Sequence, residues 1–199
     1  IRHRGPDWSG VYADAGAVLA HERLSIVDIH GGAQPLRSTD GALALAVNGE
    51  IYNHRELEAG LSVPYVFTTQ SDCEVINALW REQGPGFVDA LNGIFAFALW
   101  DAAQQRYLIA RDPMGVIPLY FGHDREGRLW VASEMKALVG VCDDVAIFPP
   151  GHLLDSAEGR IRPYRTRDWR EFAKVDGHAI APAALKDALM QAVRRQLMC

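Results

Sequence analysis

Two apolar runs joined by a short, mostly polar segment constrain the fold of this chain more than any other feature. Residues 94–100 and 107–110 are apolar throughout, and residues 101–106 lie between them. A connection this short joins antiparallel strands, whereas a strand that is apolar at every position is buried on both faces. Two stacked antiparallel sheets, each also covered by helices, satisfy both conditions. The sequence therefore predicts an α+β fold built from two such sheets.

The other apolar patterns predict further short elements along the chain. Strands are expected within residues 11–20 (two strands around Asp14-Ala15-Gly16), 42–47, 116–121, 129–132, 151–154 and 161–162. Helical segments are expected at residues 55–63, 72–83, 86–91, 133–138 and 181–198, and loops at residues 2–7 and 29–40.

Composition excludes several classes of protein. With 199 residues, 49% of them apolar, the chain can bury a full core, and its net charge of −5 argues against nucleic acid or an anionic membrane as a partner. No run approaches the length of a membrane span, and the first residues do not form a secretory signal. The three scattered cysteines (Cys73, Cys142 and Cys199) indicate a reducing compartment, the cytoplasm. The histidines never pair at ligand spacing, so no metal is predicted.

The segment from Val47 to His54 has the first features of a site. The expected strand 42–47 ends at Asn48-Gly49, a dipeptide that breaks a strand as a turn does. The side-chain NH2 of Asn48 and the backbone N–H of Gly49 are two donors that can converge on the oxygen of a tetrahedral acyl intermediate. A simple hairpin turn is the alternative.

Two charged residues elsewhere suit an amino-acid ligand. Asp72 lies in Ser71-Asp72-Cys73-Glu74, which has the form of a capping box, and its carboxylate either stabilises the helix N-terminus or receives a substrate ammonium. Arg23 lies among apolar residues, where it forms either a structural ion pair or a ligand for a carboxylate. Cys73 is expected to be a buried, inert thiol, because neighbouring acidic residues oppose a thiolate.

Together these segments resemble the glutaminase domain of class II glutamine amidotransferases, and within that family the glutamine-hydrolysing asparagine synthetases. The resemblance covers essentially the whole chain in the family's order and is carried by residues 2–7, 21–28, 48–54, 71–74, 111–120, 133–138 and the last helix. It implies the four-layer αββα sandwich of the N-terminal-nucleophile hydrolases, which agrees with strands that are apolar on both faces.

The resemblance also implies roles for individual residues. Arg23 would bind the α-carboxylate of glutamine, beside backbone groups of Ile26 and Val27. Glu50 and Asp72 would receive the α-ammonium. Asn48 and Gly49 would form the oxyanion hole.

One difference from the family concerns the nucleophile. The family begins with a cysteine whose thiol attacks the amide and whose α-amino group serves as base. This sequence begins at Ile1, within a loop that follows that cysteine, and contains no Ser-Gly-Gly-x-Asp-Ser stretch for ATP. We therefore expect an N-terminally truncated domain, lacking the first strand and inactive alone, with no cofactor of its own.

The expected domain organisation follows. Residues 1–164 form the glutaminase domain, and residues 165–199 form a linker and the first helix leading to a synthetase domain, which would bind ATP and Mg²⁺. The predicted partners are glutamine and that synthetase domain, and a homodimer is left open. Two other interpretations also stay open: a non-catalytic module that binds an amino acid or docks on a partner, and the glutaminase domain of another class II amidotransferase.

Overall fold

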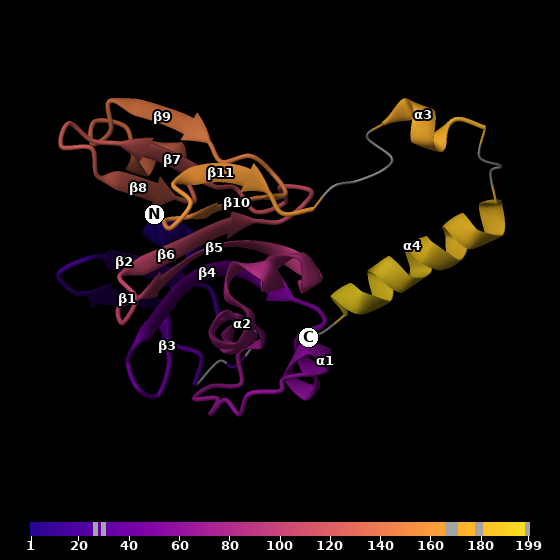
Figure 1. The fold of residues 1–199 in the computed structure, drawn as a ribbon, viewed down its shortest axis with the longest axis horizontal. Coiled ribbons are helices and arrows are strands. Elements are labelled where there is room, and N and C mark those ends of the chain that lie inside the picture. Colours follow the sequence, from indigo (N-terminus) through magenta and orange to yellow (C-terminus); the bar gives the residue numbers. More distant parts are fainter. Residues whose placement is uncertain (26–27, 29–30, 166–170, 178–180, 198–199) are drawn as a thin grey trace.

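The computed structural model describes residues 1–25, 28, 31–165, 171–177 and 181–197. Its strands pair in three antiparallel groups (Figure 1). The largest is a six-stranded sheet in the order β11-β10-β6-β5-β4-β3, with bounds Arg160–Pro163, His152–Asp155, Arg106–Arg111, Gly93–Asp101, Leu43–Ile51 and Leu36–Arg37. A three-stranded sheet has the order β8-β7-β9, with bounds Leu129–Ala132, Tyr120–His123 and Asp144–Ile147. A two-stranded ribbon pairs β1 (Trp8–Ala13) with β2 (Val18–Arg23).

Four α-helices and four short 3₁₀ segments complete the described part of the chain. The α-helices are α1 (His54–Ala59), α2 (Val75–Gln83), α3 (Phe172–Val175) and α4 (Pro182–Gln196). The 3₁₀ segments are η1 (Arg2–Arg4), η2 (Asp72–Glu74), η3 (Gly84–Ala90) and η4 (Met135–Ala137).

The predicted hairpin is confirmed, and it is buried on both faces. Strands β5 and β6 pair from Ala96↔Arg111 to Asp101↔Arg106. Phe95, Phe97 and Leu99 of β5 belong to the core shared with α2 and η3, whereas Ala96 packs with the second sheet on the opposite face. Since every strand pairs antiparallel and helices cover one face of the large sheet, the α+β class is confirmed.

The layers are visible in Figure 1. Helices α1 and α2 lie on one side of the six-stranded sheet, and strands β7, β8 and β9 lie on the other, with the β1–β2 ribbon beside them. This arrangement is consistent with the predicted αββα sandwich, which stays a prediction.

Strand β4 corrects the expectation that the strand ends before Asn48-Gly49, and it rules out the alternative of a simple hairpin turn there. The strand continues through this dipeptide to Ile51, with Asn48 opposite Ala96 and Gly49 opposite Phe95 on β5. A Cβ atom at Gly49 would lie 2.0 Å from the carbonyl oxygen of Ile94. The glycine is therefore explained by the close approach of β5 and not by a reversal of the chain.

The expected strand at residues 116–121 begins only at Tyr120, because the preceding segment binds two buried side chains. The carboxylate of Asp112 accepts hydrogen bonds from the N–H groups of Met114, Val116 and Ile117. Arg111 donates to the carbonyl oxygens of Gly115 and Ile117. With their backbone groups engaged in this way, residues 114–117 are not available for strand pairing. Strand β9, which pairs with β7, was not predicted at all.

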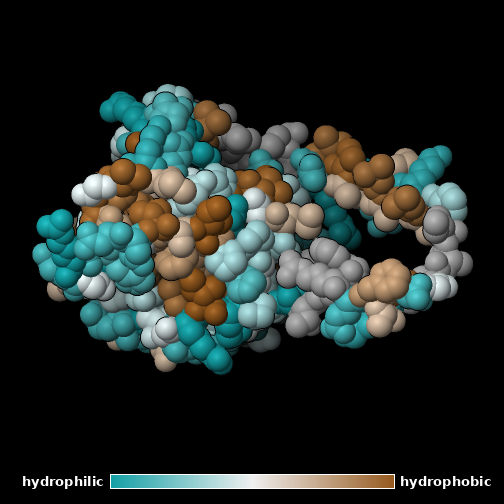
Figure 2. All heavy atoms as spheres, turned by 90° about the horizontal axis from the view of Figure 1, so that it is seen from above, coloured by the Kyte–Doolittle hydropathy of each residue, from teal (hydrophilic) through white to brown (hydrophobic). Residues whose placement is uncertain are grey.

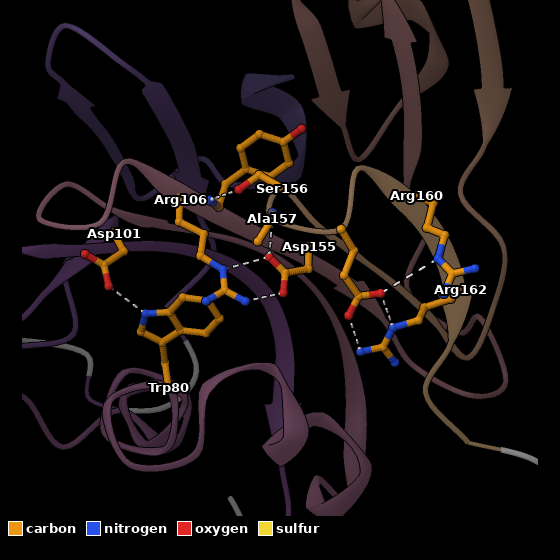
Figure 3. Close-up of polar contacts among 10 residues, drawn as sticks. Trp80, Asp101, Arg106, Asp155, Ser156, Ala157, Arg160 and Arg162 are labelled. Atoms are coloured by element: carbon orange, nitrogen blue, oxygen red, sulfur yellow. Dashed lines mark hydrogen bonds and ion pairs between the residues drawn. The ribbon is translucent and has the colours of Figure 1, made fainter.

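A polar network ties the hairpin to its neighbours at the end distant from Asn48 (Figure 3). Arg106 donates through Nε and Nη2 to the carboxylate of Asp155 on β10, and its guanidinium lies 5.0 Å from the ring centre of Trp80 on α2. The indole N–H of Trp80 donates to Asp101 at 2.8 Å. Side chains of one helix and three strands are joined here, and the buried carboxylates of Asp101 and Asp155 are satisfied.

The predicted last helix is confirmed as α4. Leu185, Leu189 and Val193 lie along one face and are exposed, and Figure 2 shows apolar side chains gathered along this helix at the upper right. Within the described residues, no helix is both long and apolar enough to cross a membrane. The predicted boundary between residues 164 and 165 stays a prediction.

Candidate functional site

Two carboxylates meet where β4 ends beside the turn that precedes α2. Asp72, which is only 3% exposed, accepts a hydrogen bond from the backbone N–H of Ile51, with 2.6 Å between Oδ2 and N. Glu50 is the preceding residue of the strand. Its burial raises the pKa of its carboxyl group, and the negative charge of Asp72 raises that pKa further. A cation bound here would offset the effect of Asp72 on Glu50, so the site favours a positively charged group.

The predicted oxyanion-hole residues lie on the same stretch of β4. In a strand, side chains two residues apart emerge on the same face, so Asn48 and Glu50 share the face opposite the buried Val47 and Ile51. The structure thus brings the predicted amide donor and one predicted ammonium receptor to one surface.

The backbone N–H and carbonyl groups of Gly49 point to the edge of β4 that faces away from β5. Both backbone groups of Val47 point away from β5, since they bind the side-chain amide of Gln34 at 2.8 Å each. Backbone groups two residues apart in a strand point to the same edge. The carbonyl oxygen of Gly49 indeed accepts the thiol hydrogen of Cys73 there, with 3.5 Å from Sγ to O. By the same alternation the N–H of Gly49 also faces this edge.

Cys73 lies beneath this edge as a protonated thiol. It is 2% exposed, and Sγ lies 3.7 Å from Oδ2 of Asp72. Burial raises the pKa of the Cys73 thiol well above its usual range, and the charge of Asp72 raises that pKa further. The predicted burial is therefore confirmed. Its inertness stays a prediction, supported by these two effects.

Arg23 approaches from β2, which contacts β4. The side chain is 8% exposed, and its Nη2 donates to the carbonyl oxygen of Asp28 at 2.6 Å. Gly32 packs against the guanidinium, because a Cβ atom there would lie 2.7 Å from Nη2. The cation predicted to bind a carboxylate is thus held by its own loop.

Asp28 connects Arg23 to the segment that precedes Asp72. One oxygen of its carboxylate, Oδ2, accepts a hydrogen bond from the backbone N–H of Gln70 at 2.8 Å, two residues before Asp72. The sequence placed Asp28 in the motif at residues 21–28 without assigning it a role. No signal in the sequence showed that it binds a segment 42 positions away.

Two further predictions concern backbone groups beside Arg23 and the absence of a metal. Ile26 and Val27 lie outside the described residues, so their predicted role stays a prediction. In the part of the chain that the structure describes, no three His, Cys, Asp or Glu side chains group so as to hold a metal ion.

A separate concave region of about 340 Å³ lies near the N-terminus. It is lined by Arg4, Pro118, Tyr120, Ser133, Glu134, Met135 and Lys136. None of the predicted site residues lines it. Its central carboxylate, Glu134, has its pKa lowered to about 2 by hydrogen bonds from Lys136, His3 and Arg4.

Comparison with solved structures first defines the class of protein. The glutamine phosphoribosylpyrophosphate amidotransferase from B. subtilis, solved with ADP and GMP, matches 75% of this chain and 35% of its own with a TM-score of 0.60 and 28% identity. A second structure, of the allosteric regulatory enzyme of purine biosynthesis, matches with a TM-score of 0.59 and 29% identity over 75% of this chain and 35% of that one. The sheets and helices described above are therefore those of an amidotransferase fold.

Sequence comparison then specifies the family. Residues 1–148 match the glutamine amidotransferase domain, and the chain belongs to this family. Asparagine synthetase B [glutamine-hydrolyzing] of Escherichia coli (strain K12) is 54% identical over 198 residues, which are 100% of this chain and 36% of the relative. The probable asparagine synthetase [glutamine-hydrolyzing] of Schizosaccharomyces pombe is 44% identical over 200 residues, again 100% of this chain and 36% of the relative. The chain thus spans about a third of the length of these relatives.

Proposed function

We propose that this chain is the glutamine-binding and ammonia-releasing domain of a glutamine-hydrolysing asparagine synthetase. The observation that carries the proposal is the pair Glu50 and Asp72, whose charges oppose each other and favour a bound cation. The names of the relatives at 54% and 44% identity support the choice of enzyme.

Recognition of glutamine follows from the charges of three residues. The α-ammonium lies against Glu50 and Asp72 and offsets their repulsion. The α-carboxylate binds the guanidinium of Arg23, whose planar fork presents two parallel N–H donors to two oxygens. Backbone groups of Ile26 and Val27 complete the binding site of the α-carboxylate, as the family resemblance implies.

Hydrolysis depends on hydrogen-bond donors that stabilise the substrate oxygen only after the thiol has attacked the amide. In the full-length protein, the thiol of the family's N-terminal cysteine attacks the side-chain amide carbon of glutamine, with the free α-amino group as base. Asn48 Nδ2 and the N–H of Gly49 donate to the oxygen that becomes negative in the tetrahedral intermediate. Collapse of the intermediate breaks the C–N bond and releases ammonia. Water then cleaves the thioester to give glutamate and restores the thiol.

The rest of the reaction lies beyond residues 1–199. A synthetase domain of the same polypeptide would bind ATP and Mg²⁺, activate the side-chain carboxylate of aspartate and transfer the released ammonia to it. The setting proposed for this protein is the cytoplasm, and it acts as a monomer or a homodimer.

Calorimetric titration with glutamine tests the binding step, in a full-length protein whose nucleophilic N-terminal cysteine is replaced by alanine so that glutamine is not consumed. We expect saturable binding that Arg23→Lys weakens strongly, because an ammonium cannot reproduce the two parallel donors of guanidinium. Arg128→Lys is a matched control, since Arg128 forms an exposed ion pair with Asp124 on the β7–β8 hairpin. Unchanged affinity in Arg23→Lys would remove Arg23 from the site.

Product analysis then separates the enzyme classes. Ammonia release from glutamine coupled to ATP-dependent formation of asparagine supports the proposal. Glutamine binding without ammonia release would instead indicate an amino-acid-binding module. Ammonia release with a different acceptor would indicate another class II amidotransferase.

A further inference from the structure

The structure assigns a positioning role to Asp28: we propose that it sets the spacing between the guanidinium of Arg23 and the turn that carries Asp72. It would thereby match the site to the distance between the α-carboxylate and the α-ammonium of one amino acid. This inference rests on the proposed function, because it concerns the same ligand.

The backbone of Asp28 holds the arginine. Its carbonyl oxygen accepts hydrogen bonds from Arg23 Nη2 at 2.6 Å and from the N–H of Gly32 at 3.0 Å. The φ angle of Asp28 is 53°, in the left-handed region that Asp adopts more readily than most non-glycine residues. Because the bond from Arg23 involves a full charge, it is stronger than a neutral hydrogen bond and restricts where the guanidinium can lie.

The side chain of Asp28 holds the second segment. Oδ1 accepts from the N–H of Gly31 at 3.0 Å, within its own loop, and Oδ2 accepts from the N–H of Gln70 at 2.8 Å. One carboxylate therefore forms hydrogen bonds with its own loop and with the segment at Gln70. Asp28 thus binds Arg23 through its backbone carbonyl oxygen, and it binds the segment that leads to Asp72 through its side chain.

The segment around Gln70 is itself held by hydrogen bonds on both sides. Before Gln70, the buried carboxylate of Glu74 accepts the N–H groups of Thr68 and Thr69 at 2.8 and 2.7 Å. After it, Asp72 is bonded to Ile51 of β4 at 2.6 Å. Asp28 thus ties the arginine loop to a segment that is held on both sides, and it adds to the contact of β2 with β4 in setting the relative position of Arg23 and Asp72.

Asp28→Asn is the most specific test of this role. An amide has a single acceptor oxygen, so Gly31 and Gln70 no longer both have a side-chain acceptor, and one of the two N–H groups faces the NH2 of the new side chain. The N–H of Gly31 keeps the backbone carbonyl oxygen of residue 28 at 3.3 Å as its other acceptor. We expect glutamine to bind the full-length protein about tenfold more weakly, as for the loss of one hydrogen bond to a charged group. We expect KM for glutamine to rise and kcat to change little, because Asp28 does not contact the reacting atoms.

A second variant and a control complete the design. Asp28→Gly retains the backbone carbonyl and permits positive φ, but it removes the hydrogen bond to the N–H of Gln70. If Asp28→Asn does not fold, the glutamine affinity of Asp28→Gly tests the inference. Asp124→Asn is the control: Asp124 accepts the N–H groups of Glu126 and Arg128 in the β7–β8 turn, away from the site. This control should leave the dissociation constant for glutamine unchanged.

A double-mutant cycle distinguishes positioning from a general loss of stability. If Asp28 acts through Arg23, the effects of Asp28→Asn and Arg23→Lys on glutamine affinity will be smaller together than their sum. Additive effects, or an unchanged affinity in a folded Asp28 variant, would overturn the inference while the proposed function stands. A wild-type protein that does not bind glutamine would overturn both.

Discussion

The carboxylate of Asp72 accepts a hydrogen bond from the backbone N–H of Ile51 at 2.6 Å, and this contact joins the turn before α2 to the end of β4. The residues of β4 that precede Ile51 are Asn48, Gly49 and Glu50, which supply the proposed oxyanion donors and one ammonium receptor. One side chain from the helical layer thus holds the end of the strand, on the side away from β5. This region and the core that supports it can be tested by substitution.

Glu50→Gln should raise stability and weaken glutamine binding. Because the pKa of Glu50 in the folded protein lies above its unfolded value of 4.5, this group favours folding most below pH 4.5, and that contribution is lost as pH rises through the folded pKa. At pH 7 the ionised carboxylate therefore lowers stability, and the neutral amide removes this cost. Thermal unfolding should give a higher Tm for the variant at pH 7, with the difference shrinking towards pH 4. An unchanged or lower Tm at pH 7 would contradict the raised pKa.

Asn48→Ala should lower kcat on glutamine much more than it raises KM. The oxyanion exists only after the thiol has attacked, so its donor stabilises the transition state and not the bound substrate. Removal of one such donor typically costs on the order of a hundredfold in kcat. Steady-state glutaminase assays of the full-length protein measure both constants. A change in KM alone would mean that Asn48 contacts the substrate but not the oxyanion.

Gly49→Ala should destabilise the domain by about 3 kcal/mol, because the new methyl group would meet the backbone of β5. The added Cβ atom would lie 2.0 Å from the carbonyl oxygen of Ile94, and φ is 143°. Gly159→Ala is the matched control: its φ is 66°, but nothing lies within 4 Å of the added Cβ. Urea unfolding of the two variants should show the larger loss for Gly49→Ala. Equal losses would mean that backbone conformation, and not the close approach of β5, requires glycine at position 49.

Arg106→Ala should also cost about 3 kcal/mol, near the lower end for breaking a buried ion pair. The carboxylate of Asp155 is fully buried, and its pKa is lowered by hydrogen bonds from Arg106, against the effect of its burial. Without Arg106 this charge lacks its partner in the core (Figure 3). Arg162→Ala breaks a more exposed pair with Glu158 and should cost less than about 1 kcal/mol. Similar losses in the two variants, measured by denaturant unfolding, would show that the network in Figure 3 adds little.

The pattern of side chains along the chain was sufficient to predict most elements. The hairpin β5–β6, the helix after Ser71 and helix α4 follow from local periodicity, because burial of one or two faces imposes a regular spacing on apolar residues. The amidotransferase resemblance also came from contiguous motifs. Local sequence failed at β9, where pairing with β7 decides the conformation, and at residues 116–119, where the buried side chains of Arg111 and Asp112 bind the backbone of the segment.

The site required the tertiary structure. Asn48-Gly49 has the composition of a turn, yet it lies in a strand that pairs with β5, and glycine is needed there because β5 approaches too closely for a side chain at position 49. Glu74 completes a capping box in the sequence, but in the structure its carboxylate binds Thr68 and Thr69. The contact between Asp28 and Gln70 spans 42 positions. Residue types and their spacing were enough to show which chemical groups are present and which segments are buried. Which of these groups meet became clear only in the folded chain, because hydrogen bonds between distant segments depend on how the layers pack.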